Sequence, residues 1–141
     1  MAIQVVLDTN VLVSALRSNR GTSFRLLSLI GKKEFELNVS VPLVIEYEDA
    51  AKRISKDSGL THSDIEDILD YICKVANRRE VYFLWRPYLK DPHDDFVLEL
   101  AVESESDFII TYNGRDFSGA EKFDIKVIAP KEFLKRIGVL K

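Results

Sequence analysis

Residues 3–14 read IQVVLDTNVLVS, and this stretch decides the fold. Its apolar start, residues 3–7, does not alternate cleanly between apolar and polar side chains, which is typical of a strand buried on both faces of a parallel sheet. Asp8 ends the run, Thr9 and Asn10 are good helix-capping residues, and the apolar residues that follow recur at helical spacing. The stretch therefore predicts a buried strand, an acidic turn and a helix.

Asp8 stands at the carboxyl end of the predicted strand, where open α/β sheets bind their ligands. An aspartate at this point also favours a helix start for purely local reasons, because its side chain accepts from the free N–H groups of the first turn. From this stretch alone, Asp8 is explained equally well as a helix cap and as a site residue.

The composition is that of an ordinary globular chain, and residues 1–141 are interpreted as a single domain. Hydrophobic residues make up 46% of the 141 and charged residues 30%, with a net charge of -3 that neither indicates nor excludes a nucleic-acid partner. Cys73 is the one cysteine, so an internal disulfide and a cysteine metal cluster are excluded, and a reducing cytoplasm is the expected setting. No apolar stretch approaches membrane-spanning length.

Short apolar runs and amphipathic helical patterns alternate along the rest of the chain. Further strands are predicted at residues 35–39, 81–85, 108–110 and 124–128, with helices between them and a closing helix at 130–137. This alternation predicts an α/β fold of three layers, α/β/α, around a central, mostly parallel sheet of four to five strands with the first strand at its centre.

Oxygen-bearing side chains recur where predicted strands give way to helices. Glu46 borders the apolar stripe of the helix after the 35–39 strand, whereas the charged residues that follow it, Glu48, Asp49, Lys52 and Arg53, are assigned to the solvated face. The alternative for Glu46 is a first-turn acid favoured by the helix dipole.

Two later junctions add more such groups. The segment DPHDD at 91–95 places three acids ahead of a helix, and charges this close repel one another unless a cation offsets them; a solvated acidic loop is the alternative. The strand at 108–110 ends in Thr111, Asn113 and Asp116. Since parallel strands end at one edge of the sheet, we expect these oxygen-bearing side chains to lie close together. A cluster of oxygen ligands alone favours Mg²⁺ or Mn²⁺. The converging residues are Asp8, Glu46, Asp94 with Asp95, and Asn113 with Asp116.

Four stretches carry a family resemblance that covers essentially the whole chain: VVLDTNVLVSAL at 5–16, VPLVIEYEDAAKR at 41–53, DPHDDFVLELA at 91–101 and DFIITYNGRDF at 107–117. They resemble the PIN domain, a family of small metal-dependent ribonucleases that includes many toxins of toxin–antitoxin pairs. The resemblance implies an RNA substrate, Mg²⁺ or Mn²⁺ as cofactor, an antitoxin partner, a homodimer and a cytoplasmic location.

By the same resemblance, Asp8, Glu46 and Asp95 correspond to metal-binding and catalytic acids, and Asp94 is a close neighbour. The common form of the last motif is T-x-D-x-D-F, whereas this chain has Asn113 in place of the first Asp and Asp116 one residue later than the second. Either Asn113 coordinates a metal or orients a water, or Asp116 completes the site.

Supporting roles are expected for a second set of residues. Asn10 and Ser14 would fix Asp8 by hydrogen bonds or contact the scissile phosphate, with helix capping and surface exposure as alternatives; Thr111 matches the threonine that precedes the family's fourth acid. Phosphate contacts are expected for some cations, with a solvated surface role as the alternative. These cations are Arg17, Arg20 and Arg115.

Two other functions remain open at this stage. A phosphoryl-transfer domain using Asp8 would need a second acid two residues later, where Asn10 stands. A non-catalytic PIN-like binding module is kept open by Asn113, although the other acids argue against it.

Overall fold

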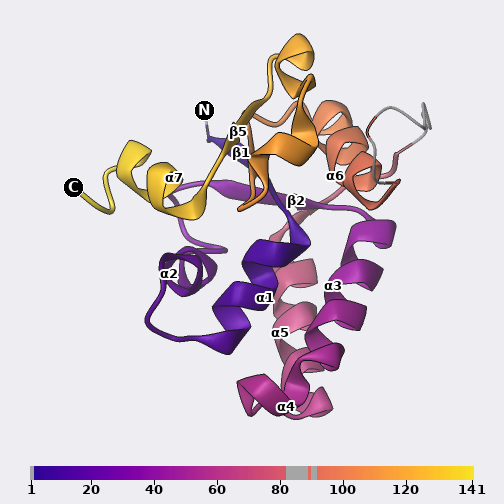
Figure 1. Cartoon of the computed structure of the whole chain (residues 1–141), viewed down its shortest axis with the longest axis vertical. Helices are drawn as coiled ribbons and strands as arrows, with labels where there is room; N and C mark the ends of the chain where they lie inside the picture. The colour runs from indigo at the N-terminus through magenta and orange to yellow at the C-terminus, as the bar shows by residue number, and fades with distance from the viewer. Residues whose placement is uncertain (1, 82–88, 90–91) are drawn as a thin grey trace.

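The computed structural model describes residues 2–81, 89 and 92–141 (Figure 1). The elements follow in this order: β1 (Gln4–Leu7), α1 (Thr9–Arg17), α2 (Thr22–Ser28), β2 (Glu36–Val39), α3 (Val41–Arg53), α4 (Ser55–Ser58), α5 (His62–Val75), β3 (Asn77–Arg78), α6 (Pro92–Glu103), β4 (Phe108–Ile110), the 3₁₀ turns η1 (Gly114–Phe117) and η2 (Ala120–Phe123), β5 (Lys126–Ile128) and α7 (Pro130–Arg136).

The strands of the described chain form one parallel sheet in the order β3-β2-β1-β4-β5. β1 is the middle strand: Val5 pairs with Leu37 on one side and with Phe108 on the other. Val5 and Val6 have no exposed surface, as their unbroken apolar run predicts. The predicted parallel sheet with a central first strand is confirmed.

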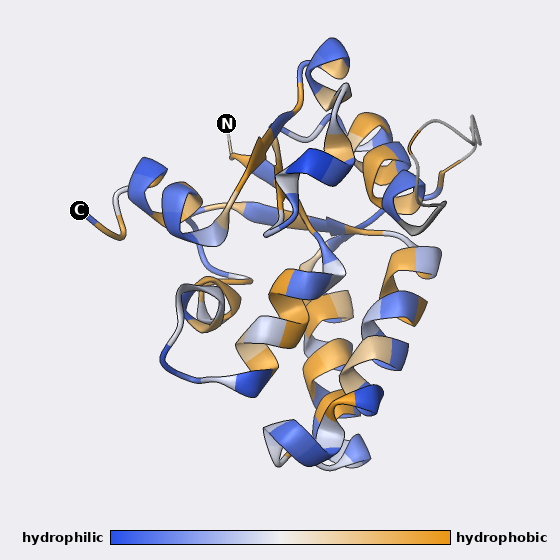
Figure 2. Cartoon of the chain, viewed as in Figure 1, coloured by the Kyte–Doolittle hydropathy of each residue, from blue (hydrophilic) through white to orange (hydrophobic). Residues whose placement is uncertain are grey.

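Helices cover both faces of this sheet. Figure 1 shows α1, α3 and α5 together on one side and α6 on the other, where α6 packs against β1, β2 and β4. Apolar residues concentrate on the strands and on the helix faces turned toward them (Figure 2). The rings of Phe35 and Phe108 each meet Phe133 of α7 edge-on, with centroids 5.4 Å apart, which closes the core beside β4. The predicted three-layer α/β/α fold is confirmed.

The helix starts explain how polar groups reach the carboxyl edge of the sheet. The Asp8 side chain caps α1 by accepting from the Thr9 N–H, so the helix-cap interpretation of Asp8 is confirmed, and Thr9 and Asn10 lie inside the helix. Ser40 caps α3 by accepting from the Leu43 N–H, and Pro42 lies in the first turn, where proline is tolerated. Each of these helices thus begins directly where β1 or β2 ends.

Two element boundaries differ from the prediction. α6 begins at Pro92, so Asp94 and Asp95 lie in its first turn and not ahead of it. The strand predicted at 81–85 lies, from residue 82 on, outside the described residues, and the sheet edge is instead formed by β3 at Asn77–Arg78. β3 was not predicted because it is only two polar residues long.

No helix in the described ranges is both long and apolar enough to cross a bilayer.

Candidate active site

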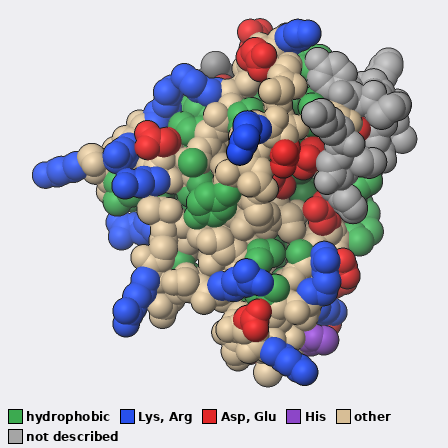
Figure 3. All heavy atoms as spheres, in the orientation of Figure 1, with side chains coloured by type: hydrophobic (Ala, Val, Ile, Leu, Met, Phe, Trp, Pro, Cys, Tyr) green, Lys and Arg blue, Asp and Glu red, His purple; other side chains and the backbone are tan. Residues whose placement is uncertain are grey.

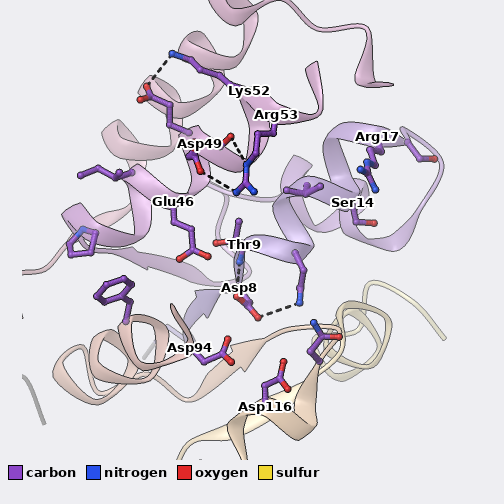
Figure 4. A pocket seen from close by; sticks show the side chains of 18 residues that line it. Asp8, Thr9, Ser14, Arg17, Glu46, Asp49, Lys52, Arg53, Asp94 and Asp116 are labelled. Carbon is purple, nitrogen blue, oxygen red and sulfur yellow. Dashed lines mark hydrogen bonds and ion pairs between the residues drawn. The ribbon is translucent and has the colours of Figure 1, made fainter. Parts of the chain in front are cut away.

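A cavity of about 1080 Å³ opens at the carboxyl end of β1, lined by residues of α1, α3, α6 and η1. Six carboxylates line it. Glu48 and Asp49 lie farther along α3, and Figure 4 shows the other four, which come from separate parts of the chain, turned toward the same space. We call this space the acidic cavity and these four the cavity carboxylates; they are Asp8, Glu46, Asp94 and Asp116.

Asp8 is the most firmly held of the four. It is 7% exposed, and its Oδ1 accepts from the Thr9 N–H at 2.8 Å. Its Oδ2 accepts from the Thr111 hydroxyl at 2.8 Å and from the Asn10 side-chain amide at 3.3 Å. Asp8 is therefore both the cap of α1 and a cavity residue, so the two readings of its sequence position do not exclude each other.

Thr111 and Asn10 join β4 to α1 around this carboxylate. The Asn10 amide donates to the Thr111 hydroxyl at 3.2 Å, and its Oδ1 accepts from the Tyr112 N–H at 3.3 Å. The Thr111 hydroxyl also accepts from the Asn113 N–H at 3.0 Å. Thr111 is 2% exposed and outside the cavity wall, so it acts on Asp8 rather than on a ligand.

Tyr47 fixes α3 against the end of β1. Its side chain is fully buried, and its hydroxyl donates to the Leu7 carbonyl oxygen, one residue before Asp8. Burial raises the pKa of Tyr47 well above its ordinary value, and the negative charges of Asp8 and Glu46 raise it further. Tyr47 is thus a neutral donor that holds the helix carrying Glu46 at the strand end.

The structure separates the two adjacent acids of α6. Asp94 is half-buried and lines the acidic cavity. Asp95 is fully buried, and its Oδ1 accepts from the Leu89 N–H at 2.9 Å. Successive helical residues point about 100° apart, which is why the two side chains differ in this way. Asp94 therefore lines the cavity and Asp95 does not, and the assignment of Asp95 as a metal-binding and catalytic acid stays a prediction.

Asn113 and Asp116, the alternatives for the last position, both line the cavity. Asn113 precedes η1, and the Asp116 N–H donates to the Asn113 carbonyl oxygen at 3.0 Å. This single turn brings both side chains to the same wall although they are three residues apart. Asp116 is the exposed member of the carboxylate set, whereas Asp8 is the buried one.

The donor chemistry of the cavity fits a hard divalent cation. Among the described residues, no three His, Cys, Asp or Glu side chains are spaced as a closed set of direct metal ligands. Mg²⁺ does not require such a set, because it retains several waters and is usually held by one or two carboxylates together with substrate phosphate oxygens. An open ring of carboxylates around a water-filled cavity suits that mode of binding.

Cations and acids share the rest of the cavity wall. Arg17, Lys52 and Arg53 line it together with Glu48 and Asp49, although the four of these residues that lie on α3 were assigned to the solvated face. Each cation is paired with an acid: Arg17 with Asp57 at 3.7 Å, Lys52 with Glu66 at 3.2 Å and Arg53 with Asp49 at 3.1 Å. Arg53 and Asp49 keep 69% and 70% of their side-chain surface exposed, so the predicted solvated position holds for them, and they line the cavity because it is open to solvent.

The other cations predicted to bind phosphate lie elsewhere. Arg20 lines a separate hollow between α2 and the end of the chain, and Arg115 is exposed without lining the acidic cavity. Lys and Arg side chains are scattered over the face seen in Figure 3. Of the three predicted arginines, the structure therefore brings only Arg17 to the cavity.

Thr9 is a cavity residue that the sequence analysis treated only as a cap. Its side chain is 8% exposed and lines the cavity, and its hydroxyl oxygen is buried with no hydrogen-bond partner in the part of the chain that the structure describes. In Figure 4 Thr9 lies between Asp8 and Glu46. A Thr directly after a strand-ending Asp is the signal that could have found it.

Thr9→Val is expected to raise the free energy of unfolding by about 1 kcal/mol, because it removes a buried hydroxyl that makes no protein hydrogen bond. Thr and Val have similar helix propensities, so the backbone preference barely changes. Urea unfolding measures the effect. Thr111→Val is the matched control: it removes a paired buried hydroxyl and should lower stability by about 1–3 kcal/mol. A loss of stability in Thr9→Val as large as in the control would contradict the assignment.

Comparison with known proteins identifies the family and a similar fold. The sequence matches the family model described as PIN domain over residues 4–115. No curated protein matches the sequence. The fold is similar to a chain in the crystal structure of VapBC2 from Rickettsia felis bound to a DNA fragment from their promoter, with a TM-score of 0.60 and 13% identity over 89% of this chain and 98% of that one.

The family match includes three of the four cavity carboxylates, Asp8, Glu46 and Asp94, and ends one residue before the fourth, Asp116. It also includes the central strand β1 and its neighbours β2 and β4. The chain belongs to the PIN domain family.

Proposed function

We propose that this protein is a metal-dependent endoribonuclease that hydrolyses phosphodiester bonds of RNA, with Mg²⁺ or Mn²⁺ as cofactor. One observation carries the proposal: six carboxylates from four separate parts of the chain line a single cavity at the carboxyl edge of a parallel sheet. Helix capping accounts for Asp8 alone. Without a cation, this cluster would repel a phosphate group, so the cofactor follows from the chemistry.

In this proposal Asp8, Glu46 and Asp94 hold the cation, and Asp116 or Asn113 completes the site. A bound cation lowers the pKa of a coordinated water and offsets the charge that develops on the phosphate in the transition state. The chain's own contribution is positional. Thr111, Asn10 and the Thr9 N–H fix the Asp8 carboxylate, and the buried Thr9 hydroxyl is available to donate to a ligand oxygen.

The cations of the cavity wall support a nucleic-acid substrate. The same cavity that holds the carboxylates is also lined by Arg17, Lys52 and Arg53. Backbone phosphates bound to these cations would lie beside the cleavage position. Their partner acids are exposed, so exchanging a surface ion pair for a phosphate contact costs little. RNA rather than DNA follows from the family resemblance.

The structural relative supports a role in a toxin–antitoxin pair. That structure is of VapBC2 bound to a promoter DNA fragment, and its fold extends over 89% of this chain. By analogy we propose that this chain is the toxin, that an antitoxin protein binds it, that it acts in the cytoplasm as a homodimer, and that any DNA contact belongs to the partner.

A non-catalytic binding module is the second candidate. It is favoured by Asn113 in place of the family's acid and by the open spacing of the described carboxylates. The two candidates differ in metal binding, because a module without a nuclease centre needs no cation at Asp8. Isothermal titration with Mn²⁺ separates them.

The decisive test is incubation of the purified protein with end-labelled single-stranded RNA in Mn²⁺, in Mg²⁺ and in EDTA. Cleavage is expected with either metal, should stop in EDTA and should return when Mn²⁺ is added in excess, since the carboxylates alone cannot activate water. A DNA strand of the same sequence is the substrate control. Cleavage that continues in EDTA, or its absence with both metals, would sink the proposal.

A further inference from the structure

Tyr112 is an exposed aromatic residue beside the acidic cavity. It lies between Thr111, which donates to Asp8, and Asn113, which lines the cavity wall. Its side chain is 46% exposed. Its backbone N–H donates to Asn10 Oδ1 at 3.3 Å, so the residue is anchored to the start of α1. Tyr112 therefore lies beside the proposed cleavage centre, and it is not one of the cavity carboxylates. We call this position the rim of the centre.

The hydroxyl end of the Tyr112 ring faces α1 and α2. Burial raises the pKa of Tyr112, and the polar side chains of Ser23, Ser14 and Thr22 lower it to below its ordinary value. Ser14 and Ser23 are joined by a hydrogen bond of 2.9 Å between their hydroxyls, and Ser14 lines the cavity. The ring thus extends from the end of β4 toward α1 and α2.

An exposed tyrosine is not unusual by itself, and Tyr71 provides the comparison within this chain. Tyr71 is 47% exposed on α5, and its hydroxyl donates to the Ile30 carbonyl oxygen at 3.1 Å. Neither tyrosine lines the acidic cavity. The two tyrosines are similarly exposed, and they differ in that Tyr112 is the chain neighbour of Thr111, which donates to Asp8, and of Asn113, which lines the cavity.

The bases of a nucleic acid need a contact surface of a different kind from the charged groups of the acidic cavity. The carboxylates and cations of the cavity act on the phosphate groups, whereas a base binds to a flat apolar surface. An aromatic ring on an anchored backbone supplies that surface, and a tyrosine side chain has few rotatable bonds to order on binding. Resting on the proposed nuclease function, we propose that Tyr112 stacks against the base of a nucleotide next to the scissile phosphate, so the substrate must present an unpaired base there.

The experiment compares Tyr112→Ala, Tyr112→Phe and the control Tyr71→Ala on a single-stranded RNA whose cleavage position has been mapped with the wild-type protein. Loss of one stacked base is expected to weaken binding about 5- to 150-fold in Tyr112→Ala. Tyr112→Phe keeps the ring and Tyr71→Ala leaves the rim intact, so both should stay within about threefold of wild type. Fluorescence anisotropy with Ca²⁺ in place of Mn²⁺ measures binding, and initial rates with Mn²⁺ give KM and kcat.

A second set of substrates replaces each nucleotide flanking the cut with an abasic one. The abasic position that faces Tyr112 should weaken wild-type binding and have no further effect in Tyr112→Ala, because both changes remove the same contact. Additive effects of the two changes would overturn the proposal, as would equal losses in Tyr112→Phe and Tyr112→Ala. If wild-type protein binds RNA without cleaving it, the nuclease function fails while stacking is still decided by anisotropy; if it binds none, both fail.

Discussion

Asp8→Asn is expected to fold like the wild-type chain and to lose RNA cleavage by at least about 100-fold, the upper end of the losses seen when only outer partners of metal ligands are changed. The fold should survive because Asn caps helices as well as Asp does and keeps an oxygen for the Thr9 N–H. Activity should not survive, because the substitution removes the negative charge of the most buried cavity carboxylate. We expect this charge to contribute more than the others to binding of the proposed cation.

Three measurements define the outcome for Asp8→Asn. Circular dichroism and thermal unfolding establish that the variant is folded, titration calorimetry with Mn²⁺ measures the loss of metal affinity, and the RNA assay measures the loss of cleavage. A folded variant that cleaves RNA at the wild-type rate would remove Asp8 from the site. Retention of Mn²⁺ affinity together with lost cleavage would mean that the other carboxylates bind the cation and that Asp8 acts on the substrate.

The second large effect separates the neighbouring acids of α6. Asp94→Asn is expected to reduce cleavage at least about 100-fold with little change in stability, since Asp94 is half-buried on the cavity wall. Asp95→Asn keeps an oxygen acceptor for the Leu89 N–H and should stay within about threefold of wild-type activity. Asp95→Ala leaves that N–H unpaired and should lower the free energy of unfolding by about 1–3 kcal/mol.

Matched assays of the two Asn variants decide between the acids. Initial cleavage rates at a fixed Mn²⁺ concentration give the activity, and urea unfolding of the Asn and Ala variants gives the stability. The family resemblance assigns the catalytic role to Asp95, whereas the structure favours Asp94. Greater loss of activity in Asp95→Asn than in Asp94→Asn would restore the assignment from sequence.

The sheet could be predicted from sequence because its signal is local and strong. An unbroken apolar run followed by a cap and a helical period identifies β1, and the repeated alternation of strand and helix fixes a parallel sheet. The convergence of polar groups at one edge then follows from topology. This is why Glu46, Asn113 and Asp116 were expected near Asp8, and all four line the cavity.

The remaining details depend on angles that the residue pattern does not fix. Moving the start of α6 by a few residues rotates its first turn, so the choice between Asp94 and Asp95 required the observed helix boundary at Pro92. Lys52 and Arg53 reach the cavity because of how α3 lies against α1, which is a matter of packing. The unpaired hydroxyl of Thr9 is likewise a tertiary property, since its residue type alone indicates only a cap.

The position of β1 at the centre of the sheet has a consequence for the order in which the protein assembles. Thr111, which donates to Asp8, follows it by 103 positions, and β4, which pairs with β1, is made just before Thr111. Pairing of distant parallel strands is slower than local helix formation. A nascent chain that ends before β4 therefore carries Asp8 and Glu46 without the strand and the hydroxyl that hold Asp8 in place, and the candidate site can form only after β4 has been made.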